Sequence, residues 1–285
     1  VPEKCQTGMS SSMKNQINRV LSDGDFKAKK KSTMSLYGGE DGKAILVGLG
    51  KSDDCTIHDY RNAGATVTAT IKKSHGNEMT VRFDGAGISH MAAFAEGMML
   101  RDYSYNNYKK GDDDEEEVEV SIRITCSEKE EEELVGKVNI LKGVCKGVHL
   151  SRDLGNCPPN DMYPEVFADM ARDWAKDFDN VDVTIINYDE AVKAGMGGLV
   201  AVGMGSSRKP CMVIFEMNKD VKGRCPVLVG KGITFDTGGI SLKPGANMDE
   251  MKYDMGGSAT VFGTMEALAQ TGFEGKVVGI TCMAE

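Results

Sequence analysis

Apolar and polar positions alternate between the periodicity of strands and that of helices along the first half of the chain. Residues Ala44–Gly50 form a short apolar run closed by glycines, which is typical of a buried strand. The pattern then predicts a helix over His58–Lys73, a strand over Met79–Phe83 and a helix over Met91–Leu100. Strands that alternate with helices in this way indicate an α/β domain.

Another strand and a long helix are predicted before the middle of the chain. Apolar and polar residues alternate over Val118–Cys126, as they do in a half-buried strand. The positions that we expect to point inward are Val118, Val120, Ile122 and Ile124. Glu130–His149 has an acidic first turn and apolar residues at helical spacing, and we expect this helix to end near Gly147.

A change of pattern near residue 150 predicts a domain boundary. The paired prolines Pro158 and Pro159 cannot continue a helix, so Ser151–Asn160 is expected to be an extended turn. We therefore predict an N-terminal α/β domain over 1–150, ending in a linker helix, and a second domain over 151–285. Pro164 stands where a first-turn proline is favoured, which predicts a helix through Ala175.

The second half of the chain carries the pattern of one central sheet. Three β-branched apolar runs, Val181–Ile186, Met212–Phe215 and Val227–Val229, predict strands of this sheet. Met255–Ala269 has helical spacing and Val277–Thr281 predicts a final strand. Because the sequence stops just after that strand, we expect the second domain to be incomplete.

Composition and charge narrow the class of protein. Hydrophobic residues make up 40% and charged residues 27% of the 285 positions, which is typical of a globular protein. The net charge of −9 disfavours nucleic acids and anionic membranes as partners. Two charged clusters, Lys27–Lys31 and Asp112–Glu117, are interpreted as solvated loops. The eight cysteines lack paired spacing, no apolar run reaches the ~20 residues of a membrane span, and no signal peptide is recognisable, so we expect a cytoplasmic protein.

A glycine-rich segment, Val229–Gly257, holds the candidate chemistry. Asp236 and Asp254 offer hard oxygen ligands for divalent cations. Lys231 and Lys243 can act near such ions, one as a neutral nitrogen ligand and one as a charged group that polarises a carbonyl. A purely structural glycine turn is the open alternative. A phosphate-binding loop is disfavoured because no GxxxxGK[ST] match is present.

The stretch Val229–Met265 resembles the signature of the leucine aminopeptidase (cytosol aminopeptidase) family of two-metal peptidases. Weaker resemblance is carried by Gly97–Tyr103 and by Arg152–Asn160. The resemblance implies a macro-domain-like N-terminal α/β domain, followed by a mixed-sheet α/β zinc-peptidase-like catalytic domain that is incomplete at its C-terminus. It also implies release of leucine-like residues from peptides with a free N-terminus, by metal-assisted hydrolysis in which a water shared by two ions attacks the carbonyl.

The family's site residues can be assigned to matching positions of this sequence. The resemblance implies that Lys231 and Asp254 bind the tightly held metal, and that Asp236 bridges both metals. Asp254 is also expected to hold the substrate's amino group, Lys243 to act as the catalytic electrophile, and Met251 to line the pocket for the first side chain. The implied cofactors are two divalent ions, zinc or manganese, with magnesium or cobalt as alternatives. None of the four histidines matches a family ligand.

This sequence departs from the family pattern in one respect. A second signature, Asn-Thr-Asp-Ala-Glu-Gly-Arg, is absent, and in the family it supplies two more carboxylate ligands and the arginine that anchors a bicarbonate. We therefore expect the 285-residue chain to be inactive alone. The family forms hexamers, so a homo-oligomer is implied. The alternatives are a non-catalytic fragment, or a moonlighting protein that binds nucleotides or DNA.

Overall fold

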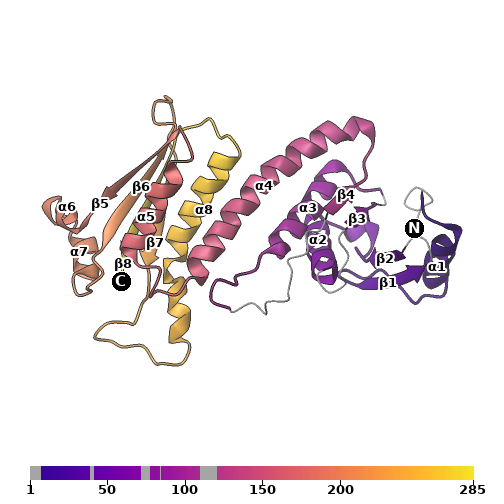
Figure 1. The fold of residues 1–285 in the computed structure, drawn as a ribbon, viewed down its shortest axis with the longest axis horizontal. Coiled ribbons are helices and arrows are strands. Elements are labelled where there is room, and N and C mark those ends of the chain that lie inside the picture. Colours follow the sequence, from indigo (N-terminus) through magenta and orange to yellow (C-terminus); the bar gives the residue numbers. More distant parts are fainter. Residues whose placement is uncertain (1–7, 39–41, 72–77, 84, 110–120) are drawn as a thin grey trace. The chain divides into compact units, whose positions relative to one another are not determined.

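The computed structural model describes residues 8–38, 42–71, 78–83, 85–109 and 121–285, shown in Figure 1. They divide into two compact units, Val1–Lys142 and Gly143–Glu285, which are described separately. The division falls inside helix α4 (Glu128–Asn156). Expectations for the acidic run Asp112–Glu117, and for Cys5, His75, Val118 and Val120, concern positions outside the described residues.

Unit 1 combines short sheets with helices. Its elements are α1 (Ser11–Ser22), β1 (Thr33–Gly38), β2 (Gly42–Val47), η3 (Ser52–Asp54), α2 (Ile57–Ile71), β3 (Glu78–Val81), α3 (Ile88–Asp102), β4 (Ser121–Ile124) and the first part of α4. Strands β1 and β2 pair antiparallel, and β3 and β4 pair parallel. Helices α2 and α3 approach so closely that a Cβ at Gly64 or Gly97 would clash with the backbone of the opposite helix. Glycine at both positions permits this approach. This confirms the predicted α/β character of the first half.

Several local predictions for unit 1 need correction. Helix α1 and strand β1 were not predicted, although Ser10 caps α1 through its side chain and Met13 and Ile17 are buried. Ile122 was expected to point inward, but it is 38% exposed, so that prediction is wrong. The physical reason is that β4 pairs with one short strand, β3, and lies at a sheet margin where period-two alternation does not guarantee burial.

Unit 2 is built around a four-stranded sheet with the order β5-β6-β8-β7. The strands are β5 (Val181–Ile186), β6 (Cys211–Met217), β7 (Val227–Ile233) and β8 (Val277–Ala284). Strands β5, β6 and β8 pair antiparallel, whereas β7 is parallel to β8. The sheet is therefore mixed, as the resemblance implied, and all four strands were predicted.

Helices pack against this sheet (Figure 1), and several of them contribute to a core of aromatic and methionine side chains. They are α5 (Pro164–Ala175), α6 (Tyr188–Lys193), α7 (Gly197–Gly203), the 3-10 segment η4 (Met248–Met255), α8 (Gly256–Gln270) and the last part of α4. Phe167 of α5, Phe215 of β6 and Phe262 of α8 are almost fully buried together. The short helices α6 and α7 were not predicted from the sequence.

Helix α4 is longer than predicted. It continues to Asn156 instead of ending near Gly147, so the expected extended turn begins only after its first six residues. Leu154 is buried in the core of unit 2, and this burial stabilises the additional turns. The helix can extend this far because the first proline, which lacks a backbone N–H, is Pro158. Among the described residues, no helix is long and apolar enough to cross a membrane.

Candidate metal centre

The site begins where strand β7 meets helix α8. A Cβ at Gly230 would lie 2.5 Å from the carbonyl oxygen of Gly257, and Ser258 donates its hydroxyl to the Gly230 carbonyl at 3.2 Å. The strand and the first turn of the helix are therefore in backbone contact, which side chains at either glycine would prevent. This contact places Lys231 of β7 beside η4, the segment that precedes α8.

Lys231 and Asp254 form the first ion pair of the site. The Lys231 Nζ lies 2.6 Å from Oδ1 and 2.7 Å from Oδ2 of Asp254, so the ammonium contacts both carboxylate oxygens. The Asp254 side chain is 21% exposed and that of Lys231 is 61% exposed. The pair is accessible from solvent, as a site for an ion or a substrate must be.

Asp236 and Lys243 form the second ion pair, in the loop that follows β7. The Lys243 Nζ lies 2.7 Å from Asp236 Oδ2, while the backbone N–H of Gly238 donates to Oδ1 at 2.9 Å. Gly238 has a φ of 86°, a left-handed conformation that favours glycine and turns the loop back toward the lysine. Lys243 N–H closes this turn by donating to the Thr237 carbonyl at 2.9 Å.

These contacts keep Asp236 ionised. The hydrogen bond from Lys243 is the main reason that the pKa of Asp236 lies below its usual value, and the Gly238 N–H acts in the same direction. The charge of Lys231 also lowers this pKa, so the two ion pairs are close enough to interact electrostatically. A negatively charged Asp236 is the form that binds a cation.

Met251 also faces the second pair. Its sulfur lies 3.1 Å from the Lys243 Nζ, so the thioether accepts from the ammonium. The structure thus gathers all five residues singled out from the sequence around one loop system: Lys231, Asp236, Lys243, Met251 and Asp254. Asn156 and Tyr253 were not predicted as part of this site. The Tyr253 hydroxyl, next to Asp254, donates to Asn156 Oδ1 at 2.6 Å. The two residues are 97 positions apart, so no local sequence pattern indicates this contact.

The donor set suits divalent cations. The site offers two carboxylates, Asp236 and Asp254, together with the Lys231 amine, and carboxylate oxygens are preferred ligands of hard cations. Within the described ranges, no three or more His, Cys, Asp or Glu side chains gather into a metal cluster. Lys231, Asp236 and Asp254 are therefore the described residues that could hold part of a metal site.

A cavity of about 620 Å³ borders the same loop system. Phe235, next to Asp236, and Lys252, two residues before Asp254, both line it. Arg208 also lines the cavity, and its guanidinium carbon lies over the Tyr163 ring, 3.8 Å from the centroid. The site thus has an adjoining space of the size that ligand pockets occupy.

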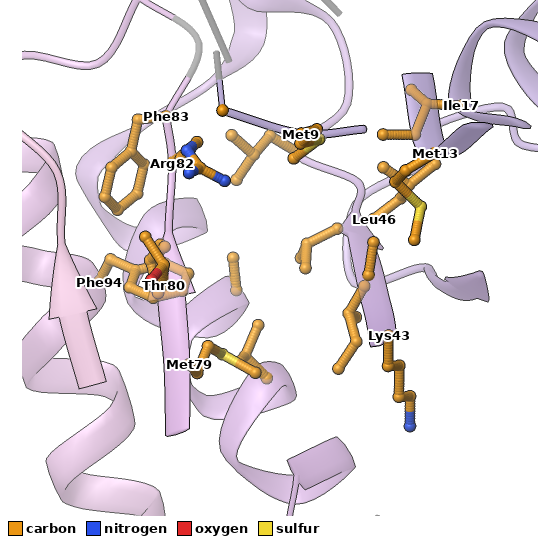
Figure 2. A pocket seen from close by; sticks show the side chains of 18 of the residues that line it. Met9, Met13, Ile17, Lys43, Leu46, Met79, Thr80, Arg82, Phe83 and Phe94 are labelled. Carbon is orange, nitrogen blue, oxygen red and sulfur yellow. The ribbon is translucent and has the colours of Figure 1, made fainter. Parts of the chain in front are cut away.

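Unit 1 contains a separate cavity of about 500 Å³. Figure 2 shows Met9, Met13 and Leu46 on one side of it and Met79 and Phe94 on the other. Consecutive residues of β2 and β3 line it, so strand edges as well as side chains face the space. Its lining combines apolar side chains with the charged residues Lys43, Glu78 and Arg82.

Taken together, unit 2 defines a mixed-sheet α/β protein with a lysine- and aspartate-based site at the carboxyl end of one strand. The profile of the cytosol aminopeptidase family, catalytic domain, matches residues 149–285, and that of the family's N-terminal domain matches residues 3–112. The chain belongs to the cytosol aminopeptidase family.

Individual relatives agree with this assignment. The chain is 37% identical over 278 residues to a probable cytosol aminopeptidase of Agrobacterium fabrum, covering 94% of this chain and 55% of the relative. It is 34% identical over 279 residues to the cytosol aminopeptidase of Pseudomonas aeruginosa, covering 94% and 56%. The chain thus spans about half the length of the curated relatives it matches.

Two solved structures share the fold. A mutant of tomato leucine aminopeptidase superposes with a TM-score of 0.80 at 28% identity, covering 96% of this chain and 54% of that one. The bottromycin maturation enzyme BotP in complex with Mn superposes with a TM-score of 0.78 at 28% identity, covering 98% and 58%. The predicted fold class is confirmed.

Proposed function

We propose that this chain contributes to a metal-dependent aminopeptidase that releases leucine-like residues from the free N-terminus of peptides. The observation that carries the proposal is the pairing of Lys231 with Asp254 beside the pairing of Lys243 with Asp236. A structural glycine turn, the open alternative, requires neither two accessible carboxylates nor two lysines facing them. The names of the relatives, and the Mn of the BotP structure, support the same reading.

Lys231, Asp236 and Asp254 are the residues that would hold divalent ions, zinc or manganese. When bound, such ions polarise the scissile carbonyl and lower the pKa of water so that hydroxide is available near neutral pH. Binding would require that Asp236 exchange Lys243 for the ions. It would also require that the Lys231 ammonium leave Asp254 and lose one proton to solvent, since only the neutral amine has a lone pair for a metal. Because both pairs are partly exposed, this exchange needs no opening of the core.

The remaining residues act on the peptide. Lys243 carries a positive charge on a flexible stem, so it can turn from Asp236 to the carbonyl oxygen and stabilise the negative charge that develops there. Asp254 can accept a hydrogen bond from the substrate's amino group, which would select peptides with a free N-terminus. Met251, in contact with Lys243, supplies an adaptable apolar wall for a leucine-like side chain.

We further infer that the 285-residue polypeptide is nearly inactive by itself. Lys231, Asp236 and Asp254 offer three protein ligands, as many as one catalytic zinc ion takes, so two ions sharing them would be held weakly. Homo-oligomerisation and a cytosolic location are proposed with the family assignment, and the relatives' names support the location.

Hydrolysis of leucine p-nitroanilide with added Mn²⁺ or Zn²⁺ tests the function, with a chelator as control. We expect slow hydrolysis that the chelator abolishes and that Asp236→Asn also abolishes. The matched control is Asp220→Asn, an exposed aspartate outside the site, which should retain the activity. Hydrolysis that survives chelation would contradict the proposal, as would equal rates for the two variants.

A further inference from the structure

The segment that carries Asp254 is tied to the end of helix α4. The Tyr253 hydroxyl donates to Asn156 Oδ1 at 2.6 Å, and the Lys252 Nζ approaches the Asn156 carbonyl oxygen at 3.4 Å. Asn156 is the last residue of α4, and Lys252 and Tyr253 are the two residues of η4 that precede Asp254. Asn156 thus contacts the two residues that directly precede Asp254, a proposed metal ligand.

Gly155 adds a steric part to this connection. A Cβ at Gly155 would lie 3.2 Å from Tyr253 Cδ1 and 3.4 Å from Cε1, which is tighter than ordinary carbon contacts. The tyrosine ring therefore lies against the helix backbone, where a side chain would push it away. The absence of a Cβ at position 155 lets the hydroxyl reach Asn156.

The last part of helix α4 is packed tightly against α8 within unit 2. Ser151 donates its hydroxyl to the Ala259 carbonyl of α8 at 2.8 Å, and Leu154 is 1% exposed. Gly147 leaves no room for a Cβ against the backbone of α8 at Gly263. A group bound to the last turn of α4 is therefore held in place relative to α8 and, through the Gly230–Gly257 contact, relative to β7.

Asp254 has weaker anchors of its own. Its carboxylate pairs with Lys231, whose side chain is 61% exposed, and an exposed ion pair holds two side chains only loosely. The loop before η4, from residue 234 to 247, contains neither helix nor strand. The orientation of η4 is determined by its packing against β7, by Met255, which is buried, and by the contacts of Tyr253 and Lys252 with α4.

We propose that Asn156 and Gly155 are positioning residues of the metal centre: they hold Tyr253, and through it η4, so that Asp254 stays opposite Lys231. This inference rests on the proposed function, because Lys231 and Asp254 are taken there as metal ligands. It adds residues from a different helix that touch neither the ions nor the substrate. Groups behind metal ligands commonly determine how well those ligands are oriented.

Amide hydrogen exchange of the metal-free protein tests the connection itself. Tyr253→Phe removes only the hydroxyl, and we expect exchange over residues 248–255 to accelerate about fivefold, the ratio for loss of one ordinary hydrogen bond. Asn156→Asp keeps the acceptor oxygen and should leave the rate unchanged. The matched control is Tyr188→Phe, in helix α6, which should not alter this segment. Unchanged exchange in Tyr253→Phe would overturn the inference.

Mn²⁺ binding, followed by the paramagnetic resonance of the free ion, tests the consequence. We expect Tyr253→Phe to weaken the affinity about tenfold, the lower end for groups behind metal ligands. Gly155→Ala separates positioning from stability, since alanine favours the helix while its Cβ displaces the ring. That variant should bind Mn²⁺ more weakly although its thermal midpoint does not fall.

The two experiments distinguish failure of the proposed function from failure of the positioning role. If the unchanged chain binds no Mn²⁺, the proposed function is contradicted, and hydrogen exchange alone decides whether Asn156 holds η4. If the unchanged chain binds Mn²⁺ and both Tyr253→Phe and Gly155→Ala bind it equally well, the positioning role is overturned while the proposed function stands.

Discussion

Lys231, in the middle of strand β7, donates to both carboxylate oxygens of Asp254, which lies 23 positions later at the end of η4. The strand and the 3-10 segment meet because Gly230 and Gly257 let their backbones touch. This pair lies near a second one, Asp236 with Lys243, because the charge of Lys231 also acts on Asp236. The concentration of paired charges at one loop system is what gives unit 2 a candidate site.

The first prediction concerns stability. Asp254→Asn removes the charge of an ion pair whose lysine is largely exposed, so we expect the free energy of unfolding to fall by less than about 1 kcal/mol. Trp174, the only tryptophan of the chain, lies in the core of unit 2 and reports its unfolding in urea. A loss of several kcal/mol would show that the pair is structural instead of functional.

The second prediction concerns the contact between β7 and α8. Gly230→Ala places a Cβ 2.5 Å from a carbonyl oxygen, and we expect unit 2 to lose about 1–3 kcal/mol, the usual cost of overpacking. Gly198→Ala, where nothing lies within 4 Å, is the control and should not destabilise. Equal stability of the two variants would mean that the close approach is not required.

The third prediction concerns pH and unit 1. The pKa of Asp59 is lowered to about 2, first by the hydrogen bond from Lys30 and then by the backbone and hydroxyl of Thr56. Because the folded pKa is depressed, its stabilising contribution is complete above the ordinary value of 3.8 and is lost as the pH falls through about 2. Carboxyl carbon NMR should show this titration. In Lys30→Met it should move toward 3.8, and no movement would refute the assigned cause.

The fourth prediction concerns thiol reactivity. Burial raises the pKa of Cys211 to about 12, and its sulfur faces the Pro164 carbonyl at 3.5 Å. Iodoacetamide at pH 8 should therefore leave Cys211 unmodified in the folded protein and alkylate it in urea, as followed by mass spectrometry. The less buried Cys225 should react before Cys211. Rapid labelling of Cys211 under native conditions would contradict its burial.

The sequence predicted the central sheet of unit 2 well because each strand is a compact apolar run between breaking residues. It failed for the end of α4. The pattern predicts an end near Gly147 and an extended turn from Ser151, but the helix continues to Asn156 because Leu154 is buried, which is a tertiary effect. It also failed for Ile122, because alternation of residue types does not reveal whether a strand lies at a sheet margin.

The candidate site was predictable to a similar degree. Lys231, Asp236, Lys243 and Asp254 lie within one glycine-rich segment, so residue type and resemblance were enough to select them. The contact of Tyr253 with Asn156 was not predictable, because a single hydrogen bond across 97 positions has no local pattern. Only the folded arrangement of α4 and η4 brings the two residues together.

Mn²⁺ titration of four variants tests the central account most directly. We predict that Lys231→Met, Asp236→Asn and Asp254→Asn each weaken Mn²⁺ binding at least about tenfold, because each removes a metal ligand. Lys243→Met should bind Mn²⁺ as tightly as the unchanged chain or more tightly, since it removes a competing positive charge from Asp236. Loss of binding in Lys243→Met alone, or equal affinity in all four variants, would contradict the account.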